Sequence, residues 1–193
     1  MKRNYSKDEV KVPRKIGIIH QAAELRDGLF GQNEAVDPEH ALDSLCEQIC
    51  GFDWFVGDCF FDGMTDVVAF AKFDNGRQVF ISESVYEDLG KYQTDKYRRA
   101  AFVVAHEIGH AVLHHRTRKG FARHKLGSEE NYRVEVKREK EANIFAGSFL
   151  IPTTKIDPAL SDYTLSRVYQ TSYQVAGYSK KEAQLYRKWL HRK

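Results

Sequence analysis

The stretch AHEIGHAVLHH, residues 105–115, holds the side chains of this chain best suited to chemistry. On an α-helix, which turns about 100° per residue, His106 and His110 project side by side with Cβ atoms about 5–6 Å apart. Two imidazoles at this spacing can bind one tetrahedral zinc ion. Glu107 is offset from the ligand direction, where its carboxylate can take a proton from water that the metal activates. The spacing H-E-x-x-H therefore predicts a zinc site with Glu107 as its general base.

The alternative is a helix with two ordinary histidines, because the five-residue motif also occurs by chance. Gly109 favours the zinc site. A glycine in the middle of a helix costs about 1 kcal/mol relative to alanine, and the rest of this helix consists of good helix formers. We expect Gly109 to allow another backbone to come close beside the metal.

The third ligand is not expected on the same helix. Histidines at positions i, i+4 and i+8 of a straight helix cannot all converge on one ion, so His114 should lie beside the site. The longer motif H-E-x-x-H-x-x-G-x-x-H is excluded, because Leu113 and Arg116 stand where its glycine and third histidine would be. A ligand from another helix is required.

A second helical segment further along the chain supplies that ligand. Glu139 shares a helical face with small and apolar residues that should pack inward, whereas Glu141 points about 160° away. A carboxylate on a packed face needs a partner, and a zinc ion would serve. Glu139 is the predicted third ligand, with Glu135 one turn earlier as the reserve. The alternative is a surface glutamate paired with Lys140 or Arg138.

The elements that must position these residues follow from the hydrophobic period and from turn signals. Asp37-Pro38 is typical of a helix N-terminus, and Asn75-Gly76 is typical of a tight hairpin. Aromatic and β-branched runs between the helices predict a small, mostly antiparallel sheet, so the pattern indicates the α+β class. The predicted helices are 16–29, 38–51, 94–115, 134–150, 165–175 and 179–190, and the predicted strands are 52–61, 65–73 and 78–81.

Composition sets limits on the class of protein. The chain has 193 residues, of which 42% are hydrophobic, enough for one compact domain with a small appendage. No apolar run approaches the roughly 18–20 residues of a membrane span, and the basic, polar start is not expected to act as a secretory signal. Three cysteines cannot all pair, which favours a reduced, cytoplasmic setting. Cys46 and Cys50, four apart in a helix-like run, are expected to be small buried residues.

Charge gives little support to nucleic-acid binding. The formal net charge is +3, and the basic residues gather in the N-terminal tail and in residues 116–125. Neither cluster has aromatic residues interleaved at a spacing that would suggest base stacking, so both are expected to be solvated. Residues 116–131 join the two ligand-bearing helices, which predicts a mobile loop at the rim of the site. The alternative is a solvated connector with no role.

Two motifs together resemble the ImmA/IrrE family of zinc metallopeptidases: HEIGHAVLHH and, some thirty residues later, EKEANIFAGSFLIP. The similarity spans roughly Gly51 to Pro152, and LSRVYQTSYQVAGY resembles a divergent form of the family's helical tail. The resemblance implies that His106, His110 and Glu139 bind zinc and that Glu107 is the catalytic base. It also implies a zincin-like domain with N-terminal helices over 1–152 and a small helical extension over 153–193.

Studied members of this family are intracellular proteases that cut a helix-turn-helix repressor. The resemblance thus implies a cytoplasmic endopeptidase with one zinc ion per chain, whose partner is such a repressor or an antitoxin-like regulator. The alternative is a non-catalytic, zinc-stabilised module that sequesters a regulator, but a structural zinc site has no use for Glu107. Asn143 could orient a ligand. The oxyanion-stabilising donor stays open, with His114 and Tyr132 among the candidates.

Overall fold

The computed structural model describes residues 12–30, 35–61, 63–64, 67–73, 76–113 and 129–192, with side chains from Arg133 onward in the last range. Helices, a small sheet and further helices follow one another, so the predicted α+β class is confirmed. The elements are α1 (Arg14–Leu29), α2 (Pro38–Gln48), β1 (Phe52–Val56), the 3-10 helix η1 (Asp58–Phe61), β2 (Ala69–Lys72), β3 (Arg77–Ile81), α3 (Glu83–Leu89), α4 (Asp95–Val112), α5 (Glu129–Leu150), α6 (Asp162–Val168) and α7 (Tyr173–Leu190).

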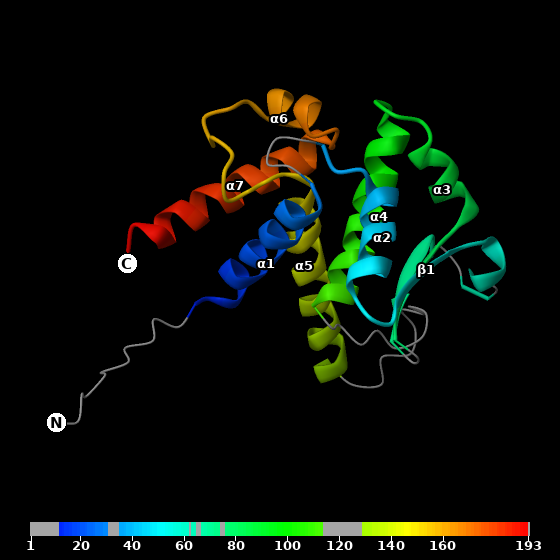
Figure 1. Ribbon diagram of the computed structural model, residues 1–193. Coiled ribbons are helices and arrows are strands. Elements are labelled where there is room, and N and C mark those ends of the chain that lie inside the picture. The colour runs from blue at the N-terminus through cyan, green and yellow to red at the C-terminus, as the bar shows by residue number, and fades with distance from the viewer. Residues whose placement is uncertain are drawn as a thin grey trace.

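Helices α4 and α5 form the centre of the molecule (Figure 1). The sheet and helices α2 and α3 lie on the α4 side, whereas α1, α6 and α7 lie on the α5 side. Helix α4 packs on β2 and β3, and α5 packs on α1 and α7. The two helices that carry the predicted ligands are therefore held from both sides.

The sheet has the strand order β1-β3-β2 and is mixed. Strands β2 and β3 are antiparallel, as the hairpin prediction requires, but β1 pairs with β3 in parallel. The chain passes through η1 and β2 before it returns as the central strand β3, so β3 runs in the same direction as β1. The expectation of a mostly antiparallel sheet was therefore wrong. The turn residues Asp74 and Asn75 lie outside the described residues. Gly76 has φ +123°, and a Cβ there would collide with the carbonyl oxygen of Gly51.

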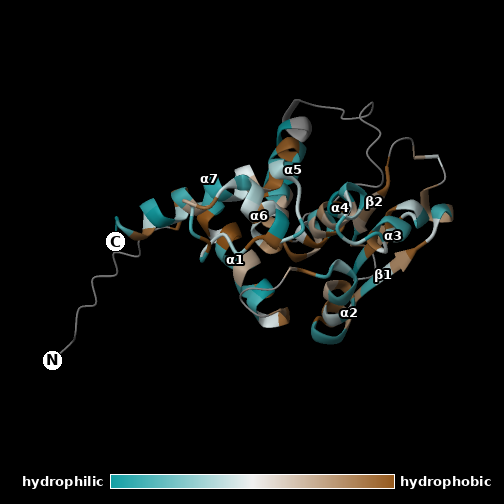
Figure 2. Cartoon of the chain, turned by 90° about the horizontal axis from the view of Figure 1, so that it is seen from above, coloured by the Kyte–Doolittle hydropathy of each residue, from teal (hydrophilic) through white to brown (hydrophobic). Residues whose placement is uncertain are grey.

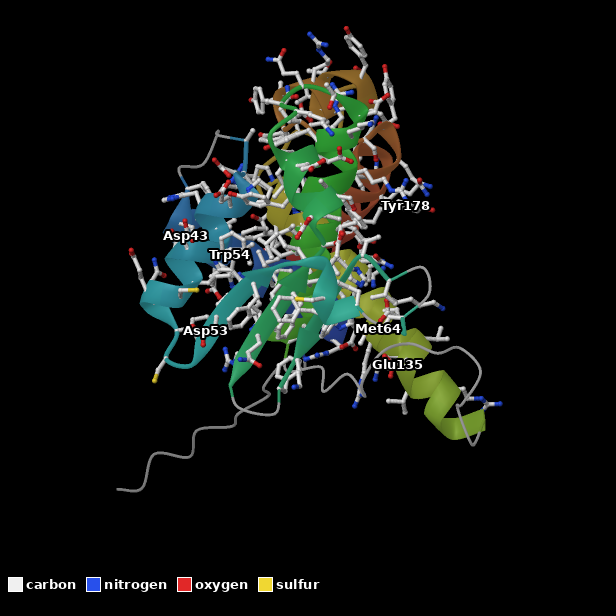
Figure 3. All side chains as sticks on the ribbon, turned by 90° about the vertical axis from the view of Figure 1, so that its right-hand side faces the viewer. Asp43, Asp53, Trp54, Met64, Glu135 and Tyr178 are labelled. Carbon is white, nitrogen blue, oxygen red and sulfur yellow. The ribbon has the colours of Figure 1, made fainter. Side chains whose placement is uncertain are left out.

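Side-chain caps explain where several helices begin. Asp37 caps α2 as predicted, accepting hydrogen bonds from the backbone N–H groups of Glu39 at 3.0 Å and His40 at 3.3 Å. Thr94 caps α4 through the N–H of Tyr97. Ser82 caps α3, a short helix that the sequence interpretation missed because it has only two turns. Figure 3 shows Trp54 of β1 near Asp43 of α2, and the indole N–H donates to that carboxylate at 3.0 Å.

The main core lies between the sheet and the helices α1, α2, α4 and α5. The apolar stripe predicted on α4 faces it, with Tyr97, Ala101, Val104 and Ile108 buried. A smaller cluster around Leu165 joins α7 to the end of α5, and Phe102 of α4 packs against both clusters. Figure 2 shows hydrophobic residues on the central elements and mainly hydrophilic ones toward the C-terminal end of α7.

Several predicted boundaries differ from those of the structure. Helix α5 begins at Glu129 rather than near Val134. The two terminal helices were divided in the wrong place: Gly177 lies inside α7, and the break falls at Gln170, whose φ is +50°. Cys50 follows the end of α2 and is exposed, so the expectation of a buried residue was wrong there.

None of the helices in the described part of the chain is long and apolar enough to cross a bilayer. Three predicted segments lie wholly or partly outside the described residues: the N-terminal basic tail up to Lys11, the end of the histidine segment at 114–115, and residues 116–128 of the predicted loop.

Candidate metal centre

Three predicted ligand side chains meet between α4 and α5. The Nε2 atoms of His106 and His110, one turn apart on α4, lie 3.0 Å from each other. Glu139 of α5 spans the pair: Oε2 is 3.2 Å from His106 Nε2, and Oε1 is 3.2 Å from His110 Nε2. In the described part of the chain these three residues form a group whose ligand atoms lie within 4.8 Å of one another.

The spacing of these atoms fits one small ion. Zinc binds imidazole nitrogen at about 2.0–2.1 Å and carboxylate oxygen at about 2.0–2.2 Å, so neighbouring ligand atoms of a tetrahedral site lie about 3.3 Å apart. The separations of 3.0 to 3.2 Å between the two imidazoles and Glu139 are close to that value. Two nitrogens and a carboxylate also match the donor set of catalytic zinc, in which a fourth position stays open. The residues therefore fit a zinc ion.

Asn143 fixes the orientation of the first histidine. Its Oδ1 lies 3.0 Å from Nδ1 of His106. An amide oxygen only accepts, so a neutral ring in this contact carries its proton on Nδ1, and Nε2, which faces Glu139, is then the nitrogen that can bind a metal. Asn143 lies one turn after Glu139 on α5, where the sequence analysis expected a residue that orients a ligand.

The charges of the three groups support one another. Burial by itself would raise the pKa of Glu139, but the hydrogen bonds with His106 and His110 outweigh it and hold that pKa well below its usual range. Burial would likewise lower the pKa of His106, yet the contact with Glu139 and the negative charge of Glu107 leave it raised. The site between these three side chains therefore favours positive charge, either as protons on the histidines or as a bound metal ion.

Glu107 is buried on α4, beside the first histidine, and faces strand β2. Burial raises the pKa of its carboxyl group, while the charges of His106 and His110 and a hydrogen bond from the backbone N–H of Ala71 act in the opposite direction. The N–H of Ala71 holds the carboxylate in place. Nothing in the sequence pointed to Ala71, because this contact depends on how the sheet packs against α4.

Gly109 lies where another backbone comes close beside the site, as its mid-helix position predicts. A Cβ at Gly109 would lie 3.2 Å from the carbonyl oxygen of Ala142 and 3.1 Å from Cδ1 of Phe145, both on α5. The missing side chain lets α5 approach α4 closely enough for Glu139 to reach both histidines. The glycine therefore lies between the two helices that form the site.

Two glutamates of α5 that were expected on opposite faces are both at least partly buried. Glu139 is half-buried at the site, but Glu141, which was expected to face outward, is buried as well. Its Oε2 accepts a hydrogen bond from Arg14 of α1 at 2.8 Å. Helix α5 packs against α1 on one side and α4 on the other, so two of its faces are covered. The reserve ligand Glu135 is also buried and is not part of the three-residue group.

Two residues considered in the sequence analysis cannot be placed. His114 and the side chain of Tyr132 lie outside the described residues. The alternative interpretation paired Glu139 with Arg138 or Lys140. In the structure Glu139 contacts both histidines instead. Arg138 lies 3.7 Å from Glu135, and Lys140 is exposed.

Two histidines one turn apart on one helix, a glutamate between them and a second glutamate from a neighbouring helix define a site of the metallopeptidase type. The comparison with known families agrees. Residues 91–179 match the family model Peptidase_M78, described as the IrrE N-terminal-like domain. The match contains all four predicted site residues and confirms the resemblance to the ImmA/IrrE family. It starts after the sheet and extends through α6 into α7. No curated protein matches the chain.

Proposed function

We propose that this protein is a zinc-dependent endopeptidase that cleaves a partner protein, with a helix-turn-helix transcriptional repressor or an antitoxin-like regulator as the expected substrate. The observation that supports it most is the convergence of His106, His110 and Glu139 on one point, with the buried Glu107 beside it. The match to a metallopeptidase family supports the same reaction class. The nature of the partner rests on the resemblance to the ImmA/IrrE family.

The residues of the chain have separate roles in this reaction. His106, His110 and Glu139 would hold the zinc ion, which when bound supplies Lewis acidity that activates water and polarises a peptide carbonyl. Asn143 keeps the His106 ring in the tautomer that offers Nε2. Glu107 takes a proton from the attacking water and returns it to the leaving amine, so that one peptide bond and one water give a carboxylic acid and an amine. Burial raises the pKa of Glu107, which makes its carboxylate a better proton acceptor.

The central experiment compares the native chain with Glu107→Gln, loaded with zinc, on purified helix-turn-helix regulators encoded near this gene. We expect the native chain to produce two fragments, identified by mass spectrometry. Glu107→Gln should retain the zinc and the fold but lose cleavage by at least about 100-fold, the usual contribution of a general base.

The second candidate function is a zinc-stabilised module that sequesters a regulator without cutting it. Glu107→Gln separates the two because it leaves the ligands intact. If the variant binds and inactivates the regulator as well as the native chain does, and no fragments appear with either, the endopeptidase proposal is wrong. A chain that binds no zinc would exclude both.

A further inference from the structure

A second carboxylate of α5 lies near the candidate metal centre and takes no part in it. Glu135 precedes Glu139 by one helical turn, a spacing that places the Cβ atoms of both side chains about 5–6 Å apart on one side of the helix. Figure 3 shows Glu135 in the first half of α5, at the end of the molecule where the sheet also lies. The residue is only 9% exposed.

The oxygens of Glu135 are poorly satisfied. Oε2 lies 3.7 Å from Nη1 of Arg138, beyond hydrogen-bond distance. Oε1 is buried and has no hydrogen-bond partner in the part of the chain that the structure describes. Glu141, a second buried glutamate of α5, has a guanidinium 2.8 Å away. A buried carboxylate that lacks such a partner is costly, so Glu135 is ready to accept a hydrogen bond from a cation.

Glu135 lies one helical turn from Glu139 and close to the candidate metal centre. Burial raises the pKa of its carboxyl group, and the charges of Arg138, Glu139 and His110 also act on it. Its carboxylate is nevertheless outside the group of ligand atoms that could hold the ion. The Glu135 carboxylate can instead accept a hydrogen bond from a positively charged group of the substrate. A lysine or arginine side chain is the matching group of a polypeptide.

We propose that Glu135 is a specificity-determining residue that binds the ammonium or guanidinium group of a basic substrate residue next to the scissile bond. This inference rests on the proposed endopeptidase function and adds the substrate preference. A site built to hydrogen-bond a polar group discriminates strongly against an analogue that lacks it, because its own buried group is then left without a partner. We expect a basic residue to be favoured over an apolar residue of the same length by about tenfold or more.

The test uses binding, so it does not depend on knowing the natural substrate. Tripeptide hydroxamates carrying lysine or norleucine at either of the two residues nearest the hydroxamate would be titrated into the zinc-loaded full chain, with fluorescence polarisation as the readout. The lysine compound should bind about tenfold or more tightly than its norleucine match in at least one of the two positions. Glu135→Gln should remove the difference, and Glu135→Asp should restore part of it.

Glu141→Gln is the matched control, since it removes a buried charge of the same helix that already has a partner. It should leave the lysine preference unchanged. Zinc content is measured first in every variant. Equal binding of lysine and norleucine compounds to a zinc-loaded chain overturns the role of Glu135 while the proposed function stands. Loss of zinc in Glu135→Gln also overturns it, because the residue would then be a ligand. A native chain without zinc overturns both.

Discussion

Gly109 of α4 lies directly against Phe145 of α5, and a Cβ added to it would be 3.1 Å from the ring and 3.2 Å from the backbone oxygen of Ala142. Phe145 is fully buried and stacks on Phe149, with ring centroids 5.8 Å apart. Neither the ring nor the helical backbone has room to retreat. The distance between the two ligand-bearing helices therefore depends on this glycine.

Gly109→Ala should destabilise the protein and weaken metal binding. Alanine favours the helix by about 1 kcal/mol, but overpacking against a rigid neighbour costs about 1–3 kcal/mol, and the displaced α5 would carry Glu139 away from the histidines. Urea denaturation and zinc titration measure the two effects. Gly17→Ala in α1 is the control, because nothing lies within 4 Å of its would-be Cβ, and it should be neutral or stabilising. Equal behaviour of the two variants would contradict this account.

Metal occupancy should depend on Glu139 and not on Glu141. Elemental analysis of the native protein should give about one zinc per chain, because two histidines and one carboxylate are a usual zinc ligand set. Glu139→Gln should reduce occupancy strongly and abolish the rise in melting temperature that zinc gives the native chain. Glu141→Gln should keep the zinc and lose less than about 1 kcal/mol of stability, since Arg14 is largely exposed. The opposite result would move the third ligand to Glu141.

Asn143 should contribute to zinc affinity without much effect on folding. Groups that orient a metal-binding histidine are typically worth about 10–100-fold in metal affinity, and Asn143 is exposed, so its truncation leaves no cavity. Asn143→Ala should bind zinc more weakly by that factor in competition with a chelator, with the melting temperature of the metal-free protein nearly unchanged. Asn143→Asp should retain affinity because a carboxylate also accepts from Nδ1–H. Lys140→Ala, an exposed neighbour, serves as the control.

Stability should fall at high pH because of Tyr97. Burial raises the pKa of this tyrosine to about 12, with a smaller contribution from the charge of Asp37. In the unfolded chain its proton leaves near pH 10, so the folded state binds more protons between pH 10 and 12. The resulting stabilisation is complete below pH 10 and is lost as the pH rises through that window, by up to about 3 kcal/mol.

Tyr97→Phe provides the comparison. It loses the hydrogen bond from the phenol to the carbonyl oxygen of Val36, 3.4 Å long, and should be less stable than the native chain at pH 8 by about 1 kcal/mol. The difference should shrink and reverse above pH 10, because phenylalanine carries no titrating group. Parallel pH profiles of the two proteins in urea denaturation would show that Tyr97 does not titrate as described.

The sequence alone determined the local parts of the site. Spacing on one helix places His106 beside His110 with Glu107 between them, since helical geometry depends only on neighbouring residues. The same holds for the Asp37 cap and for Gly109, whose cost to the helix indicated a close approach. Helical periodicity selected Glu139, which does lie beside both histidines, but it wrongly placed Glu141 on an exposed face. Periodicity tells which residues share a face of a helix but not how many of its faces are covered.

Only the tertiary structure decided the contacts between segments. That α5 packs between α4 and α1, that Arg14 pairs with Glu141 and that Ala71 holds Glu107 all join residues distant in the chain. The parallel pairing of β1 with β3 and the break at Gln170 are of the same kind, since strand order and a left-handed residue are set by packing that no local pattern encodes. The incomplete pairing of Glu135 likewise becomes visible only when its surroundings are known.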